Sequence, residues 1–225
     1  MSQFKPPRYG PKAIRHLKMV DPVLAPIIEL VGPFKPNWVG ERFAALGYSI
    51  ISQQISTKAA ASIRKKVLDQ LGPAGFTPQS ILRQKFIALR NCGLSNQKAT
   101  YLQDLATKVS KGHVELHSIH DHDDEIVIER LIQVRGIGRW TAEMFLIFSL
   151  GRPDVLPVDD LGLRAAIKRL DGLKEMPTKQ AVRERGALWK PYSSVATWYL
   201  WQSLRYPEAP ELSVRARQLN IKKRR

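Results

Sequence analysis

Apolar residues recur three or four positions apart along most of this chain, and that spacing restricts its fold more than any other feature. Between Arg42 and Leu68 the apolar positions mostly stand four apart, which is the spacing of one helix face: Phe43, Leu46, Ile50, Ile55, Ala59, Ile63 and Val67. No strand pattern of comparable length occurs in the sequence. We therefore predict an all-α protein.

Further helices follow from periodicity and from capping residues. Thr77-Pro78 is typical of a helix start, and Asp123 is predicted to cap a helix that carries Ile128, Leu131 and Ile132. Helical spacing is also present over residues 94–111, 140–150 and 193–204, and Pro177-Thr178 opens another helix. The Pro-rich segment to about Gly40 is expected to wrap the body as an arm, and the basic tail after Pro210 to fray.

The charge of the chain indicates a polyanionic partner. Among 225 residues, 36 are Lys or Arg and 20 are Asp or Glu, a formal net charge of +16. Such an excess favours nucleic acid, because neutralising phosphates releases condensed counterions, although a solvated basic surface would have the same composition. No apolar run approaches the roughly 18 residues of a membrane span, and the N-terminus has no apolar signal core. Cys92 is the single cysteine, which excludes an internal disulfide and a four-cysteine cluster and suits a reducing compartment.

A Gly-Ile-Gly turn lies between two predicted helices in the segment Leu131–Ala142. We expect Gly136 and Gly138 to adopt positive φ and to leave their amides open, beside the positive N-terminal end of the next helix. This arrangement would hold a phosphate, whereas the alternative is an ordinary helix–helix turn. A nucleotide-binding loop is disfavoured because no Walker lysine–hydroxyl pair follows and no strand precedes.

Three other segments carry candidate functional side chains. Asp159 and Asp160 follow an apolar loop and open a helix, where they would act chemically or simply cap it. The polar run within Ile50–Thr57 interrupts an apolar pattern, as a buried kink or as a tip presented to DNA. The segment Leu188–Trp201 is rich in aromatics, of which Trp198 or Trp201 is expected to lie in the core.

Taken together, GIGRWTAEMF, PVDDLGL and WKPYSSVATWYLW resemble the helix–hairpin–helix DNA glycosylase superfamily, over roughly residues 47–206. The closest branch is that of the alkylated-purine enzymes, 3-methyladenine DNA glycosylase II. The resemblance implies two helical lobes with the hairpin and a catalytic aspartate at the cleft between them. One lobe would span 46–157, and the other would combine 1–45 with 158–225.

The resemblance also implies roles for individual residues. Asp160 would be the catalytic carboxylate, and Asp159 would mainly cap the helix. Gln54 would fill the gap left by the flipped base, while the hairpin from Gly136 to Thr141, including Gly138 and Arg139, would hold DNA. The base pocket would contain Trp140, Met144 and Trp189 beside Asp159. The carbonyls of Ile132, Val134 and Ile137 would bind a monovalent cation, Na⁺ or K⁺, and no cofactor would be required.

Departures from the family pattern narrow the expected activity. Trp140 stands where lyase-competent relatives carry lysine, so we expect base removal without strand cleavage. Ser193 replaces an arginine common in relatives, so the local contact of that arginine is not expected here. The His-rich stretch 113–122 matches no catalytic motif of the family, and we interpret it as a solvated loop rather than a metal site.

The expected function is therefore that of a monofunctional glycosylase for alkylated purines in base excision repair. Its partner would be double-stranded DNA with damaged bases, and it would not bind a membrane. It would act as a monomer, in the cytoplasm at the nucleoid or in a nucleus. The alternatives are a non-catalytic helix–hairpin–helix DNA-binding protein and a bifunctional glycosylase/lyase. The sequence does not rank 3-methyladenine, 7-methylguanine, ethenoadenine and hypoxanthine as substrates.

Overall fold

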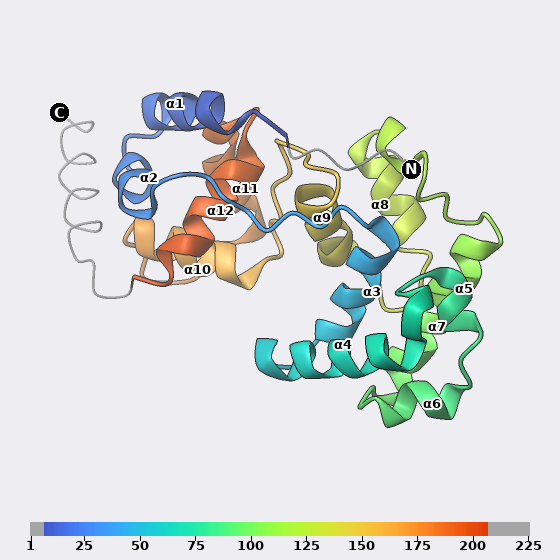
Figure 1. Cartoon of the computed structure of the whole chain (residues 1–225). Coiled ribbons are helices and arrows are strands. Elements are labelled where there is room, and N and C mark those ends of the chain that lie inside the picture. The colour runs from blue at the N-terminus through green and yellow to red at the C-terminus, as the bar shows by residue number, and fades with distance from the viewer. Residues whose placement is uncertain (1–6, 207–225) are drawn as a thin grey trace, which may run out of the picture. The chain divides into compact units, whose positions relative to one another are not determined.

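The computed structural model describes residues 7–206, and these residues form α-helices and short 3-10 turns without any strand. The prediction of an all-α protein is therefore confirmed. The described helices divide between two compact units, one formed by residues 39–150 and the other by residues 7–38 and 151–206 (Figure 1). None of these helices is long and apolar enough to cross a bilayer.

The first unit, residues 39–150, contains the middle of the chain. Its helices in order are α3 (Arg42–Ser52), α4 (Thr57–Leu71), α5 (Pro78–Leu82), α6 (Phe86–Asn91), α7 (Asn96–Ser110), α8 (Asp124–Leu131) and α9 (Arg139–Phe148), with 3-10 turns η1 (Gly72–Ala74) and η2 (Ile119–Asp121). Helix α7 packs against α3, α5 and α6, while α9 packs against α3 and α8. Leu102 and Leu105 of α7 and Ile50 and Ile51 of α3 are fully buried, so this packing forms the core of the unit.

The second unit joins the two ends of the described chain. Its helices are α1 (Gly10–Val20), α2 (Ala25–Val31), α10 (Leu161–Leu170), α11 (Lys179–Gly186) and α12 (Ser193–Ser203), with η3 (Ala187–Trp189). Helix α12 packs against α1, α2 and α10, as the neighbouring blue and orange-red ribbons in Figure 1 show. It is buried on nearly every side, which agrees with the even distribution of apolar and small residues around it.

The structure differs from the sequence expectations in two of its helical segments, and a third expectation falls outside the described residues. The apolar pattern from Arg42 to Leu68 is broken into α3 and α4 by a turn at residues 53–56, where the polar run leaves no apolar face to bury. The N-terminal segment expected as an arm contains helices α1 and α2, each with Pro in its first turn. The tail after Pro210 lies outside the described residues.

The unit boundaries fall at 38/39 and 150/151, whereas the sequence suggested 45/46 and 157/158. Residues 39–45 join the first unit because Val39 N donates to Phe148 O at 3.0 Å and Arg42 Nη1 donates to Leu116 O at 2.6 Å. Residues 151–157 join the second unit because Ser194 Oγ accepts from Val155 N at 2.9 Å. Long-range hydrogen bonds of this kind, each with at least one backbone partner, leave no periodic signal in a sequence.

Candidate functional site

The predicted hairpin is formed by α8, a turn at residues 132–138, and α9. Gly136 has a φ of +81°, and a Cβ built on it would lie 2.1 Å from Cδ2 of Tyr101, so both the backbone and the packing require glycine. Gly138 has a φ of −92°, which corrects the expectation of positive φ at both glycines. A Cβ on Gly138 would meet no atom within 4 Å. The fold therefore needs Gly136, whereas the bare backbone at Gly138 leaves the N-terminus of α9 open.

Arg139, the first residue of α9, is held by carboxylates of both hairpin helices. Its Nη1 and Nη2 donate to Glu125 at 2.9 and 2.5 Å, and its Nε donates to Glu143 at 3.2 Å. The hydrogen bonds with Glu125 raise the pKa of Arg139, and those with Arg139 lower the pKa of Glu125. In this structure the guanidinium ties α9 to α8.

The first turns of α9 present Trp140 and Met144, two predicted pocket residues. Because they are four positions apart, they share one helix face. Trp140 is 43% exposed, and Met144 is half-buried. Thr141, which was predicted to contact DNA, is only 5% exposed. A contact from this residue would therefore come from its backbone amide more readily than from its hydroxyl.

The polar run at residues 52–57 forms the turn between α3 and α4. Gln54 is exposed and has a φ of +56°, and no other non-glycine residue in the range 7–206 has positive φ. Gln53 is half-buried, and its Nε2 donates to Gly136 O in the hairpin at 2.7 Å. The two interpretations of this run thus apply to different residues: Gln53 makes a hydrogen-bonded internal contact, and Gln54 is presented outward.

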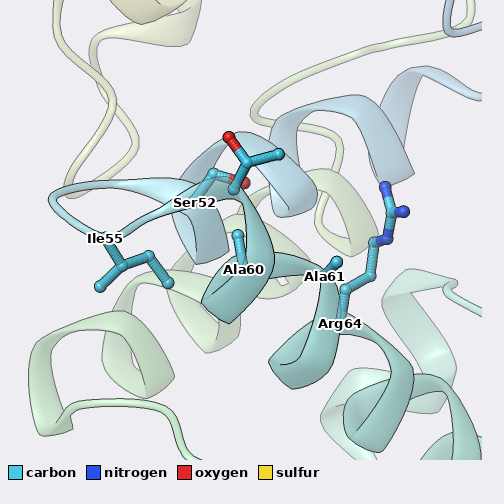
Figure 2. Close-up of a pocket in the computed structure, with 6 residues that line it drawn as sticks. Ser52, Ile55, Ala60, Ala61 and Arg64 are labelled. Carbon is cyan, nitrogen blue, oxygen red and sulfur yellow. The ribbon is translucent and has the colours of Figure 1, made fainter.

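An open cavity of about 200 Å³ flanks this turn (Figure 2). It lies between the end of α3 and the first turns of α4, and its lining is Ser52, Ile55, Thr57, Ala60, Ala61 and Arg64. The guanidinium of Arg64 lies 5.0 Å from the centroid of the Tyr48 ring, a cation–π contact. The lining of the cavity therefore combines three apolar side chains with two hydroxyl groups and one positive charge.

Asp159 and Asp160 have different environments. Asp160 is 8% exposed and is the N-cap of α10, and its Oδ1 accepts from Leu163 N at 2.5 Å and from Trp201 Nε1 at 2.8 Å. Asp159 is exposed and forms an ion pair with Lys179. The helix cap is therefore Asp160, and the expectation that Asp159 would provide it is wrong.

Gly162 completes the surroundings of Asp160. A Cβ at Gly162 would lie 3.1 Å from Asp160 Oδ1 and 3.3 Å from Trp201 Cδ1. Such contacts are tighter than ordinary van der Waals packing, so the glycine of Asp-Leu-Gly allows the indole to approach the carboxylate. Trp201 was interpreted from its spacing as a candidate core residue, and the hydrogen bond to Asp160 was missed. The aromatic pattern alone does not reveal which ring has a polar partner.

Trp189 lies in the core of the second unit and not on a pocket wall. It is 0% exposed, its Nε1 donates to Asp21 Oδ2 at 2.8 Å, and the Arg185 guanidinium lies 5.2 Å from its ring centroid. Its ring offers no surface to a base, which corrects the expectation drawn from the resemblance. Trp198, 7% exposed, belongs to the core as expected.

Ser193, the residue that departs from the family pattern, has a defined structural role. Its backbone N and its Oγ both donate to Asp154 Oδ1, at 3.1 and 2.5 Å. Ser193 thereby fixes the first turn of α12 to the segment that precedes the aspartate pair.

The hairpin turn contains the backbone carbonyls predicted to bind a monovalent cation. Val134 O accepts from Ile137 N at 3.1 Å, so two of the three residues predicted to bind a cation are joined within one turn. Backbone carbonyls in a non-helical turn are suitable ligands for Na⁺ or K⁺. Elsewhere among residues 7–206, no group of three or more His, Cys, Asp or Glu side chains is placed to hold a metal, the His-rich stretch included.

Comparison with known proteins places the chain in a family. A model of the "HhH-GPD superfamily base excision DNA repair protein" matches residues 48–191. The chain belongs to this superfamily. The matched region contains Gln54, the hairpin and both aspartates, whereas Trp201 follows it.

Individual members of the superfamily are similar over most of the chain. DNA-3-methyladenine glycosylase 1 of Schizosaccharomyces pombe is 36% identical over 197 residues, covering 85% of this chain and 86% of the relative. The alkylbase DNA glycosidase-like protein mag2 of the same yeast is 31% identical, covering 85% and 92%. A solved structure of the S. pombe 3-methyladenine DNA glycosylase in complex with abasic DNA superimposes with a TM-score of 0.78 at 36% identity, covering 86% of this chain and 97% of that one.

Proposed function

We propose that this protein is a monofunctional DNA glycosylase that flips alkylated purines, of the 3-methyladenine and 7-methylguanine type, out of double-stranded DNA and hydrolyses their bond to the sugar. The observation that carries the proposal is the buried carboxylate of Asp160, oriented by Leu163 N and Trp201 Nε1. The names of the similar yeast proteins support the substrate class.

The substrate explains why one carboxylate is enough. A purine alkylated at N3 or N7 carries positive charge, so it leaves without a strong general acid. As the bond from C1′ to the base breaks, its electron pair neutralises the base and the sugar becomes oxocarbenium-like. The negative charge of Asp160 stabilises that sugar and orients a water, whose oxygen bonds to C1′ while its proton passes to the carboxylate and then to solvent.

The remaining predicted residues hold the substrate. The ring of Trp140 supplies a face for a flat cationic base, with Met144 one turn further along α9. The backbone amides of Gly136 and Gly138 and the N-terminal end of α9 bind a DNA phosphate. Gln54, exposed at its turn, occupies the space that the flipped base leaves. The carbonyls of Ile132, Val134 and Ile137 would hold Na⁺ or K⁺ beside the phosphate, and no other cofactor is needed.

Two alternatives remain open to experiment. A non-catalytic DNA-binding protein would need the hairpin but not the oriented Asp160. A bifunctional glycosylase/lyase would need an amine to attack the sugar, and Trp140 stands where the lyase-competent relatives carry lysine. We further propose that the protein acts as a monomer on DNA, in the cytoplasm or a nucleus.

The test is release of free base from alkylated DNA. Duplexes that each contain one lesion are incubated with excess enzyme, and the released bases are separated by chromatography. We expect release of 3-methyladenine and 7-methylguanine, with intact strands before alkali treatment. Binding to DNA without release of any base from the panel would favour the non-catalytic alternative.

A further inference from the structure

Four side chains form a half-buried stripe along one face of α7. Lys98, Tyr101, Asp104 and Lys108 follow each other at intervals of three, three and four residues, so the helix places them in one row. We call this row the α7 stripe. None of its members was predicted as a functional residue, and none touches the sugar or base in the mechanism above.

One end of the α7 stripe holds the hairpin turn. Asp104 Oδ2 accepts from Arg135 N at 2.8 Å and from Lys108 Nζ at 2.7 Å, and Lys108 Nζ also donates to Gln133 O at 2.6 Å. Burial alone would raise the pKa of Asp104, but the hydrogen bonds from Lys108 and Arg135 hold that pKa below its ordinary value. The carboxylate is therefore charged, and two charge-assisted contacts fix the hairpin backbone to α7.

Tyr101, in the middle of the stripe, sets how closely the hairpin approaches. Its ring occupies the space beside Gly136, where a Cβ would stand 2.1 Å from Cδ2. The hairpin glycine is thus packed directly against α7 by contact of ring and backbone. This contact adds a steric stop to the polar contacts of Asp104 and Lys108.

The other end of the stripe holds the turn that presents Gln54. Lys98 Nζ donates to Ile51 O at 2.8 Å, in the last turn of α3, where the carbonyl has no partner within the helix. From the turn itself, Gln53 Nε2 donates to Gly136 O at 2.7 Å. The turn therefore contacts the hairpin, the hairpin contacts α7, and α7 contacts the end of α3 that leads into the turn, all within one unit.

The conformation of Gln54 needs such support. A non-glycine residue at φ +56° carries a local energetic cost and persists where neighbouring contacts determine its backbone. Its immediate neighbour Gln53 provides one contact, and Lys98 fixes the helix end three residues before it. The strained residue is thus held in place from the hairpin and from α7.

We propose that the α7 stripe and Gln53 are positioning residues that fix the distance between the phosphate-binding hairpin and the residue that fills the stack. This inference rests on the proposed function. When the hairpin holds a phosphate, Gln54 must stand at one place in the duplex to replace the flipped base. Displacement by about 1 Å would impair extrusion of a paired base while leaving Asp160, in the other unit, unchanged.

The proposal predicts a substrate-dependent defect. The same lesion is placed opposite its normal partner in one duplex and opposite an abasic-site analogue in a second, where extrusion is less costly because no partner base is lost. Asp104→Ala is expected to slow single-turnover excision from the paired duplex roughly 10- to 100-fold. Excision from the second duplex is expected to slow much less, by about threefold or less, because chemistry no longer depends on the wedge.

Asp69→Ala is the matched control. Asp69 pairs with Lys65 on α4 with the same four-residue spacing as Asp104 and Lys108, but its contacts stay on the exposed surface. Its variant should match the parent on both duplexes. Gln53→Ala removes the hydrogen bond between the turn and the hairpin without altering α7. It should show the same defect, slow excision from the paired duplex only, and it tests the proposal even if Asp104→Ala does not fold. Thermal melting of each variant verifies folding.

The outcomes separate the two proposals. If folded Asp104→Ala and Gln53→Ala proteins excise the base equally slowly from both duplexes, the positioning role is overturned. Base release by the parent enzyme would still support the proposed glycosylase activity in that case. Unchanged rates in both variants would overturn the positioning role as well. If the parent enzyme released no base from either duplex, the proposed function itself would fail, and that result is recognised before any variant is measured.

Discussion

At the scale of single residues, the aspartate pair shows how neighbours in sequence acquire different chemistry. Asp160 is buried, caps α10 and receives an indole N–H, whereas Asp159 is exposed and pairs with Lys179. Asp160→Asn keeps the shape and an acceptor for Leu163 N but removes the charge. Single-turnover excision should fall by on the order of 10²–10³, with DNA binding retained.

Asp159→Asn is the companion variant for that measurement. It loses an exposed ion pair, worth about 1 kcal/mol or less, and should excise bases at nearly the parent rate. Thermal melting of both proteins shows whether either is unfolded. An inactive Asp159→Asn beside an active Asp160→Asn would move the catalytic assignment by one residue.

Trp201 is the second residue whose contribution can be isolated. Trp201→Phe removes the N–H that Asp160 Oδ1 accepts but keeps an aromatic ring in the same space. Because a hydrogen bond to a charged group is worth about 1.5–3 kcal/mol, we expect excision to slow at least tenfold with little change in affinity for DNA. Trp198→Phe, at a buried tryptophan on the same helix, is the control and should excise at nearly the parent rate.

The two hairpin glycines also make separable contributions. Gly136→Ala must place a methyl group against Tyr101 at positive φ, which should destabilise the fold by on the order of 2–4 kcal/mol. Gly138→Ala meets no neighbour and an ordinary φ and loses only a glycine N-cap, so its melting temperature should fall much less than that of Gly136→Ala. If a phosphate lies at this amide, the new methyl should weaken DNA binding about tenfold in fluorescence anisotropy. Equal affinity of Gly138→Ala and the parent would contradict the phosphate site.

At the scale of elements, periodicity predicted the existence of helices better than their limits. Helices α5, α8 and α11 begin directly after Thr77, Asp123 and Thr178, close to where the sequence predicted helix starts. The side chains of Thr77 and Thr178 accept capping hydrogen bonds, which are local contacts, whereas the side chain of Asp123 makes no such bond. The polar run within Ile50–Thr57 indicated an interruption between α3 and α4, but the limits of the two helices were not predicted, since both continue one apolar pattern and the turn is held by a distant partner. Gln53 contacts a residue 83 positions away, and no local signal in a sequence reports such a bond.

The same distinction applies to the candidate site. The sequence motifs identified the hairpin, the aspartate pair and the Gln54 turn, which are contiguous segments. The partners of these segments come from elsewhere in the chain: Trp201 for Asp160, and α7 for the hairpin. Trp189 was misassigned because its aromatic character suits both a pocket and a core, and only its burial against Asp21 distinguishes the two.

At the scale of the whole molecule, the residue that follows the hairpin motif Gly-Ile-Gly-Arg predicts the type of reaction. Trp140 stands at the lysine position, so no Schiff base with the sugar is expected and DNA should keep intact strands after base loss. Borohydride added during the reaction should leave no covalent complex on a denaturing gel, while a bifunctional glycosylase treated in parallel is trapped. A trapped adduct would show that another lysine of this basic chain attacks the sugar.

The net charge of +16 belongs to the whole molecule and sets how binding responds to salt. Contacts through backbone amides and basic side chains address phosphates, so affinity should depend little on base sequence and fall steeply as ions compete. If roughly 6–10 phosphates are engaged, affinity should drop by about 10³–10⁵ between 50 and 200 mM salt.

Anisotropy titrations with two duplexes of unrelated sequence measure both the salt dependence and the sequence dependence of binding. Parallel lines on a plot of log affinity against log salt would support phosphate binding, and their slope gives the number of phosphates. A flat response would contradict phosphate binding. Backbone amides at the open N-terminus of α9 and basic side chains that contact phosphates must compete with dissolved ions, so their affinity for DNA has to fall as salt rises.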